Sequence, residues 1–156
     1  MSSISAMNVD ELRDLYRELI LDHARKPRHF GKLDAATHTA NGINPLCGDK
    51  LRLYLKLDND VIQDATFEGS GCAISVASAS LLTDTVIGLS TDEAIGWFDE
   101  LTARLTQDAA DSSFDLGKLH ALEGVREFPT RVKCATLAWH ALRSAIQQQS
   151  APVTTE

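Results

Sequence analysis

The chain has 156 residues, of which 44% are hydrophobic and 24% are charged, a composition typical of one soluble globular domain. Its formal net charge of −7 argues against nucleic acid as the main partner, because phosphate binding depends on clustered Lys and Arg. No apolar stretch reaches the ~20 residues that a membrane span needs. Residues 1–12 lack a basic region followed by an apolar run, so we expect no signal peptide, no membrane contact and a cytoplasmic location.

The first predicted element is a helix that begins after Asn8 and ends before Pro27. Asn8 and Glu11 form a capping box, and the apolar residues that follow keep the spacing of one helical face. Proline disfavours helix in the residue before it, which ends the run. Residues 28–41 are expected to form an irregular connection with a short strand near His38.

The clearest strand covers residues 50–58, where leucines alternate with polar or aromatic side chains. This alternation is typical of a strand with one buried and one wet face. Residues 58–60, Asp-Asn-Asp, supply a turn. Residues 61–68 would then return antiparallel to the first strand as a hairpin.

The second half of the chain is predicted to be helical. Glycines end the second strand, and the run of small residues from Cys72 to near Gly88 predicts a buried helix. Ser90 and Glu93 form a capping box for the next helix. Further on we expect a loop over 107–113, a short helix over 116–122, and a last helix that begins around Pro129 or Thr130 and runs to Gln147.

These elements predict a single α+β domain. A small antiparallel sheet of about three strands would be covered by helices. The domain would span residues 8–147, between a flexible N-terminus over 1–7 and a disordered tail over 148–156.

Three cysteines, an odd number, do not form a paired disulfide framework. Each lies at a junction between predicted elements, where a side chain can leave the core. Cys47 and Asp49 precede the clearest strand, Cys72 begins a helix, and Cys134 lies near the start of the last helix. Because a helix N-terminus favours a thiolate over a thiol, Cys72 and Cys134 are expected to be anionic and reactive.

Two interpretations of these residues remain open at this point. Three thiolates and the Asp49 carboxylate would suit tetrahedral Zn²⁺ or a transient iron–sulfur cluster. The carboxylate is a hard ligand, so the site would exchange ligands more readily than a closed structural zinc site. Alternatively, the cysteines are small buried apolar groups, since the chain has no CxxC pair.

Basic and histidine side chains supply few further candidates. Arg131 lies three residues before Cys134 and shares its helical face, so we expect it to offset the charge of a thiolate cluster. The role of Lys133 stays open. None of the five histidines is expected to be a ligand, and His23 is interpreted as a packed side chain on the apolar face of the first helix.

Three cysteine-centred motifs occur in order along the chain. They are Asn-Pro-Leu-Cys-Gly-Asp at 44–49, Gly-Ser-Gly-Cys-Ala-Ile-Ser at 69–75 and Arg-Val-Lys-Cys-Ala at 131–135. Together with Tyr16, His23 and residues 27–30, they identify the chain as resembling the IscU/NifU-type iron–sulfur assembly family. The resemblance covers residues 12–146.

Departures from the plain IscU pattern point to the family's SufU-like branch. Lys133 stands where IscU scaffolds carry a histidine, and the chaperone-binding Leu-Pro-Pro-Val-Lys segment of IscU is replaced by Glu-Phe-Pro-Thr-Arg-Val-Lys at 127–133. The separation of Cys72 and Cys134 is longer than in IscU. It resembles the SufU insertion, as does the pattern of Gly124, Pro129 and Arg131.

The resemblance implies a zinc site formed by Cys47, Asp49, Cys72 and Cys134. It further implies that Cys47 accepts sulfane sulfur from a PLP-dependent, SufS-like cysteine desulfurase. The charge of Arg131, expected nearby from its spacing to Cys134, would steady the persulfide. In this mechanism a histidine of the desulfurase takes over part of the zinc coordination, which releases Cys47 to attack the enzyme's persulfide. Downstream iron–sulfur assembly scaffold proteins would receive the sulfur.

Two alternatives use the same ligands. In one, the protein is a scaffold on which a transient [2Fe–2S] cluster is assembled and transferred; Lys133 in place of histidine counts against it. In the other, the zinc only stabilises the fold, and Asp49 counts against that.

Overall fold

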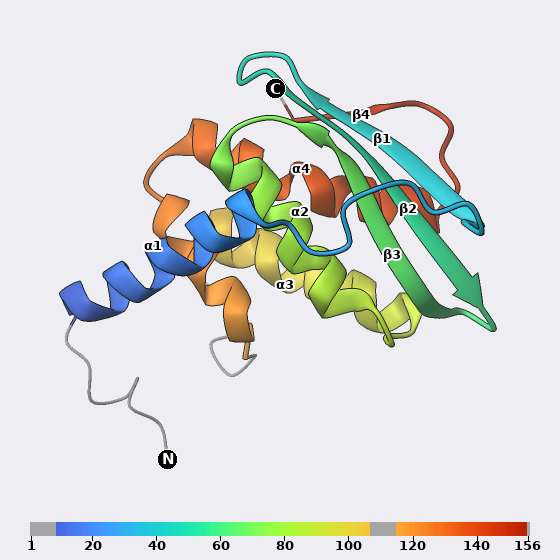
Figure 1. Ribbon diagram of the computed structural model, residues 1–156, viewed down its shortest axis with the longest axis horizontal. Helices are drawn as coiled ribbons and strands as arrows, with labels where there is room; N and C mark the ends of the chain where they lie inside the picture. Colours follow the sequence, from blue (N-terminus) through green and yellow to red (C-terminus); the bar gives the residue numbers. More distant parts are fainter. Residues whose placement is uncertain (1–8, 107–114, 156) are drawn as a thin grey trace.

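The computed structural model describes residues 9–106 and 115–155, which form one α+β domain (Figure 1). The expected flexible segment 1–7, the Asn8 cap and the expected loop over 107–113 lie outside the described residues. The elements in chain order are α1 (Val9–Arg25), β1 (His38–Asn44), β2 (Asp49–Asp58), β3 (Val61–Ser70), α2 (Ala73–Val86), α3 (Thr91–Thr106), the 3₁₀-helix η2 (Gly117–Val125), α4 (Pro129–Ile146) and β4 (Val153–Thr154).

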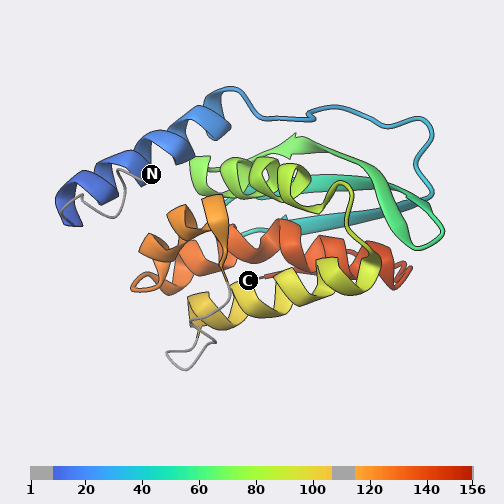
Figure 2. The same cartoon turned by 90° about the horizontal axis from the view of Figure 1, so that it is seen from below.

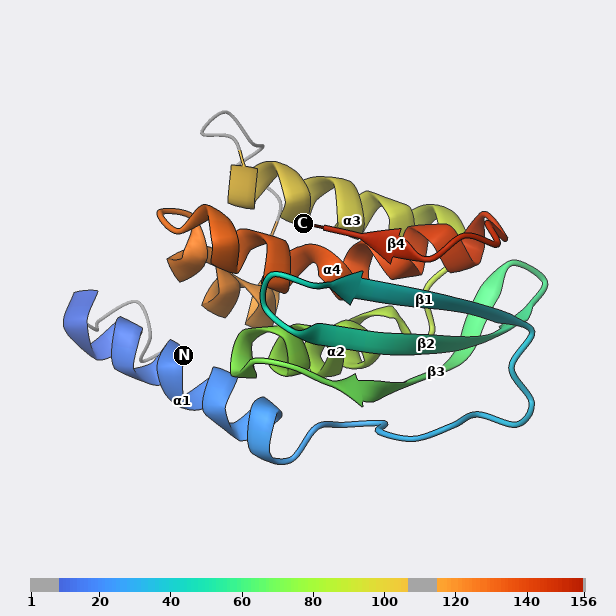
Figure 3. The same cartoon turned by 90° about the horizontal axis from the view of Figure 1, so that it is seen from above.

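The sheet has four strands in the order β3-β2-β1-β4 and is mixed (Figure 3). The predicted hairpin of β2 and β3 is confirmed, with a bulge between Lys56 and Leu57. β1 pairs antiparallel with β2, whereas β4 pairs in parallel with β1. The expectation of about three antiparallel strands is therefore corrected to four, one of them parallel.

Close helix packing explains why the sequence pattern predicted only a short strand near His38. The inward positions of β1 are Ala40, Gly42 and Asn44, so the strand shows no alternation of large apolar residues. A Cβ atom at Gly42 would lie 3.1 Å from Leu137 Cδ1 on α4. Small residues are needed on this face because α4 lies directly against β1.

The C-terminal segment differs from the disordered tail expected over 148–156. Val153 and Thr154 form β4 along the edge of β1. The Thr155 hydroxyl donates a hydrogen bond of 3.0 Å to the carbonyl oxygen of Lys133 on α4. A two-residue strand has too little hydrophobic periodicity to be predicted from sequence.

The helices are arranged on one face of the sheet. α2 and α4 lie next to the strands, α3 lies beyond α4, and α1 crosses α2 (Figure 2). η2 fills the space between α1, α3 and α4. No helix in the described ranges combines the length and apolar character needed to span a membrane. The largest fully buried side chains include Trp139, Phe67, Leu53, Leu55 and Ile62.

A buried polar link joins α2 to α4. The Ser78 hydroxyl donates to the carbonyl oxygen of Ala135 at 2.5 Å, and the Trp139 indole N–H donates to Ser78 Oγ at 3.2 Å. All three residues are buried. Because Ala135 follows Cys134, this link sets the distance between the helix that follows Cys72 and the helix that carries Cys134.

A second polar link attaches α1 to α2. His23, predicted to be packed, has no exposed surface, and its Nδ1 lies 2.7 Å from Ser80 Oγ. The backbone N–H of Arg28 donates to the same hydroxyl at 2.8 Å. Burial lowers the pKa of His23 below its ordinary value, and the positive charge of Arg28 lowers it further.

We predict that Ser78→Ala lowers the free energy of unfolding by about 1–3 kcal/mol, because the Trp139 indole N–H would lose its buried partner. Urea denaturation followed by tryptophan fluorescence measures this change. Ser144→Ala is the matched control, since Ser144 is a buried serine of α4 whose hydroxyl has no hydrogen-bond partner among the described residues. Equal losses in the two variants would contradict the prediction.

We predict that His23 makes stability fall in acid. The unfolded chain binds a proton at this residue near pH ~6.5, while the folded chain resists protonation, so stability present above that pH is lost below it. One such group changes the free energy of unfolding by at most about 1.4 kcal/mol per pH unit. His23→Gln should have a shallower loss of unfolding free energy than the wild type between roughly pH 7 and pH 5. Parallel pH profiles would show that His23 does not contribute.

Candidate metal centre

The turn between β1 and β2 carries the first two predicted ligands. Residues 45–48 form this turn, and the Cys47 N–H donates to the carbonyl oxygen of Asn44 at 3.2 Å. Gly48 has φ +70°, a conformation that glycine adopts without strain. Cys47 is half-buried. Asp49 is the first residue of β2, pairs across the hairpin with Asn44, and is 2% exposed.

The junction of β3 and α2 holds the carboxylate of Asp49 in position. Cys72 is the N-cap of α2, and its Sγ accepts a hydrogen bond of 3.4 Å from the Ser75 N–H. The N–H of Cys72 donates to Asp49 Oδ1 at 2.9 Å. A Cβ atom on Gly71 would lie 2.4 Å from Asp49 Oδ1. Gly71 is therefore required so that the chain can pass the carboxylate.

Cys134 lies in a different environment from the one predicted. It is the sixth residue of α4, beyond the free amides of the first turn, and is 3% exposed. Burial raises its pKa far above the ordinary value, and the neighbouring Cys47, Asp49 and Cys72 side chains raise it further. The helix terminus thus gives Cys134 no thiolate character, which corrects the expectation from sequence.

Three of the four predicted ligands meet in one cluster. One ligand atom each from Cys47, Asp49 and Cys134 lies within 4.8 Å of the other two. Cys72 falls outside this group, although it is near enough to raise the pKa of Cys134. Asp49 Oδ2 is buried and has no hydrogen-bond partner in the described part of the chain. A buried carboxylate oxygen without a partner, beside two thiols, fits a divalent metal with tetrahedral N, S and O preferences.

The other candidates lie outside the cluster. The Arg131 guanidinium stacks over the Phe128 ring, with Cζ 4.9 Å from the centroid. Lys133 is half-buried, and its carbonyl oxygen accepts the Thr155 hydroxyl. The described cluster consists of two cysteines and an aspartate.

Sequence reasoning missed two residues that shape this centre. Gly71 belongs to the Gly-Ser-Gly-Cys motif, where it was interpreted only as a strand breaker. Asn44 opens the Asn-Pro-Leu-Cys-Gly-Asp motif; it is fully buried, and neither atom of its side-chain amide has a partner among the described residues. Directly opposite residues of an antiparallel pair share one face, so Asn44 and Asp49 point into the same end of the core.

Comparison with known proteins agrees with the predicted resemblance. The family described as NifU-like N terminal domain matches residues 15–154. The chain belongs to this family. The zinc-dependent sulfurtransferase SufU of Bacillus subtilis (strain 168) is 43% identical over 138 residues, which cover 88% of this chain and 93% of SufU.

Two further similar proteins have comparable coverage. The iron–sulfur cluster assembly scaffold protein IscU of Streptococcus pyogenes serotype M1 is 40% identical, over 92% of this chain and 90% of IscU. A crystal structure of the putative iron–sulfur cluster assembly scaffold protein for the SUF system from Fervidobacterium islandicum AW-1 has a TM-score of 0.76 and 34% identity, covering 83% and 94% of the two chains. The protein is thus a SufU/IscU-type member of the iron–sulfur cluster assembly family.

We predict that Gly71→Ala weakens metal binding by about 10- to 100-fold, the usual effect of disturbing a group that orients a ligand. The new methyl group would displace the Asp49 carboxylate, because it would lie far inside contact distance of Asp49 Oδ1. Competition with a chromogenic chelator measures the zinc affinity. Gly96→Ala on α3 is the matched control, because its Cβ would have no neighbour within 4 Å. Equal affinities in the two variants would show that the position of Asp49 is unimportant for binding.

Proposed function

We propose that this protein accepts sulfane sulfur on Cys47 and binds Zn²⁺ through Cys47, Asp49, Cys72 and Cys134. The observation that carries the proposal is the convergence of two thiols and a buried, partly unpaired carboxylate within 4.8 Å. The SufU relative, named a zinc-dependent sulfurtransferase, supports the same conclusion. Bound Zn²⁺ would keep the cysteines as thiolates at neutral pH.

Exposure and location favour Cys47 as the acceptor. Cys134 is 3% exposed on a helix, where it has no freedom to meet a partner. Cys47 is half-buried on a turn, next to Leu46, whose side chain is 72% exposed. A thiolate on a turn can be presented to another protein without unfolding a helix.

The transfer step is an exchange between a thiolate and a persulfide. The Cys47 thiolate attacks the terminal sulfur of the donor's persulfide and forms a new sulfur–sulfur bond. The donor's own sulfur–sulfur bond breaks, and the donor cysteine leaves as a thiolate. Charge and electrons balance without an external oxidant or reductant.

The proposed partners follow from this chemistry. The donor is a PLP-dependent cysteine desulfurase, which makes a protein-bound persulfide, and the sulfur passes on to an iron–sulfur assembly scaffold. Arg131 assists as a nearby positive charge, since it lies about one turn before Cys134 on α4. A cluster of thiolates and a carboxylate is stabilised by such a cation.

We predict that Cys47→Ala abolishes sulfur acceptance. After incubation with the desulfurase and L-cysteine, mass spectrometry of alkylated peptides should locate the persulfide on the Cys47 peptide of the wild type and find none in the variant. Circular dichroism checks that the variant is folded. A persulfide on Cys72 or Cys134 instead would overturn the assignment of the acceptor.

A second candidate function is the assembly of a transient [2Fe–2S] cluster, favoured by the IscU relative named a scaffold protein. We predict about one equivalent of zinc and no acid-labile sulfide in protein purified without oxygen from iron-rich cells. Metal and sulfide analysis measures both quantities. Iron with matching sulfide would favour the scaffold function over sulfur transfer.

A further inference from the structure

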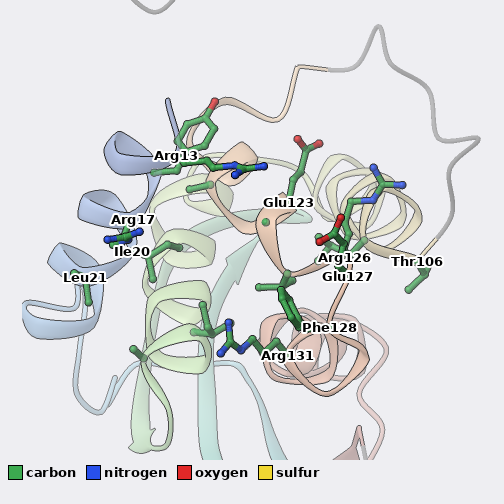
Figure 4. A pocket seen from close by; sticks show the side chains of 17 residues that line it. Arg13, Arg17, Ile20, Leu21, Thr106, Glu123, Arg126, Glu127, Phe128 and Arg131 are labelled. Carbon is green, nitrogen blue, oxygen red and sulfur yellow. The ribbon is translucent and has the colours of Figure 1, made fainter. Parts of the chain in front are cut away.

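A groove of about 1000 Å³ opens between α1 and the segment formed by η2 and the start of α4 (Figure 4). One wall is α1, from which Arg13 and Arg17 line the groove, and the opposite wall is formed by η2 and the start of α4, including Arg126 and Arg131. Arg13 and Arg17 are one helical turn apart, so they lie on the same face of α1. The groove is thus bordered by arginines on both sides.

The charge of this groove differs from that of the whole protein. The chain has a formal net charge of −7, yet four arginines line the groove against two carboxylates, Glu123 and Glu127. Glu123 is already paired, because the Arg104 guanidinium lies 3.2 Å from its Oε1. In the described ranges no carboxylate pairs with Arg13 or Arg17, and both are exposed. Arg13 and Arg17 therefore offer positive charge to the groove that no carboxylate of the described residues neutralises.

The lining between the arginines is largely apolar. Ile20 and Ile74 line the groove, and Phe128 at its edge is 48% exposed. Ala73, the residue after Cys72, also lines it, and Arg131 lies about one turn before Cys134. A ligand in the groove would therefore lie beside the proposed sulfur-accepting centre.

We propose that this groove binds an extended acidic segment of the sulfur donor protein, with carboxylates paired to Arg13, Arg17 and Arg131 and an apolar side chain over Ile74 and Phe128. The inference rests on the proposed function, since it assigns the groove to the donor. Arginine binds carboxylates in a planar, two-bond geometry, which makes it suited to such recognition. Two walls of positive charge with an apolar floor fit a peptide segment better than a small anion, which needs no apolar contact.

The test is the affinity of the double variant Arg13→Glu/Arg17→Glu for the purified cysteine desulfurase. Like charges placed against an acidic segment should raise Kd by roughly tenfold or more, mainly through slower association, and should reduce the salt dependence of binding. Surface plasmon resonance at several ionic strengths measures all three quantities. The matched control is Lys32→Glu/Lys56→Glu, an equal charge reversal at exposed sites outside the groove, and it should bind like the wild type.

The outcomes separate this proposal from the function on which it rests. Wild-type protein that takes no sulfur from the desulfurase would refute the proposed function itself. Sulfur acceptance by the wild type, together with unchanged desulfurase binding by the groove variant, would overturn the groove assignment alone. Normal donor binding with impaired delivery to a scaffold protein would also overturn it and assign the groove to the acceptor. If the double Glu variant does not fold, Arg13→Gln/Arg17→Gln should raise Kd in the same direction by a smaller factor.

Discussion

The metal centre depends on the close packing of α4 against β1. Gly42 leaves room for Leu137, with only 3.1 Å between its Cβ position and Leu137 Cδ1. This contact brings Cys134, one turn earlier on α4, to the end of β1 where the turn with Cys47 begins. The Ser78 link to Ala135 then brings α2, and Cys72 at its N-cap, to the same end. Ligands far apart in sequence therefore converge because backbones approach through small residues.

Much of this arrangement could be predicted from the sequence, and the exceptions have physical causes. Local patterns identified the β2–β3 hairpin, the helices and the motifs around the three cysteines. Most of β1 was missed because its inward residues are small, which leaves room for α4 but removes the alternation of large hydrophobic residues that predicts a strand. The start of the last helix was predicted correctly, but the environment expected for Cys134 was wrong. Cys134 is the sixth residue of α4 and lies beyond the free amides of the first turn, and its burial depends on packing between elements that are far apart in the sequence. The groove could not be predicted, because it forms where α1 packs near η2, and local sequence patterns do not predict which distant elements pack together.

The environment of Asp49 lowers the stability of the folded chain. Its Oδ1 accepts a hydrogen bond from the Cys72 amide, but Oδ2 is buried and has no partner among the described residues, and the same holds for the side-chain amide of the neighbouring Asn44. Buried polar groups without hydrogen bonds cost free energy, so a sequence selected for stability alone would replace them. Their presence at one end of the core, beside two thiols, is the pattern expected where local rules are broken for function.

The cluster also divides its residues between rigid and movable elements. Cys134 lies within α4 next to Ala135, whose carbonyl oxygen accepts the Ser78 hydroxyl, and the Asp49 carboxylate is held by the amide of Cys72. Cys47, in contrast, lies on a four-residue turn with glycine at its end. In persulfide exchange, the attacking thiolate must approach the donor sulfur along the sulfur–sulfur axis, so it needs more freedom than the remaining ligands. The proposed acceptor, on a turn, could then leave the cluster and return while Cys134 and Asp49 stay in place. The arginine-lined groove lies beside these fixed ligands, so a donor bound there would be placed relative to the rigid part of the centre while Cys47 alone moves to meet it.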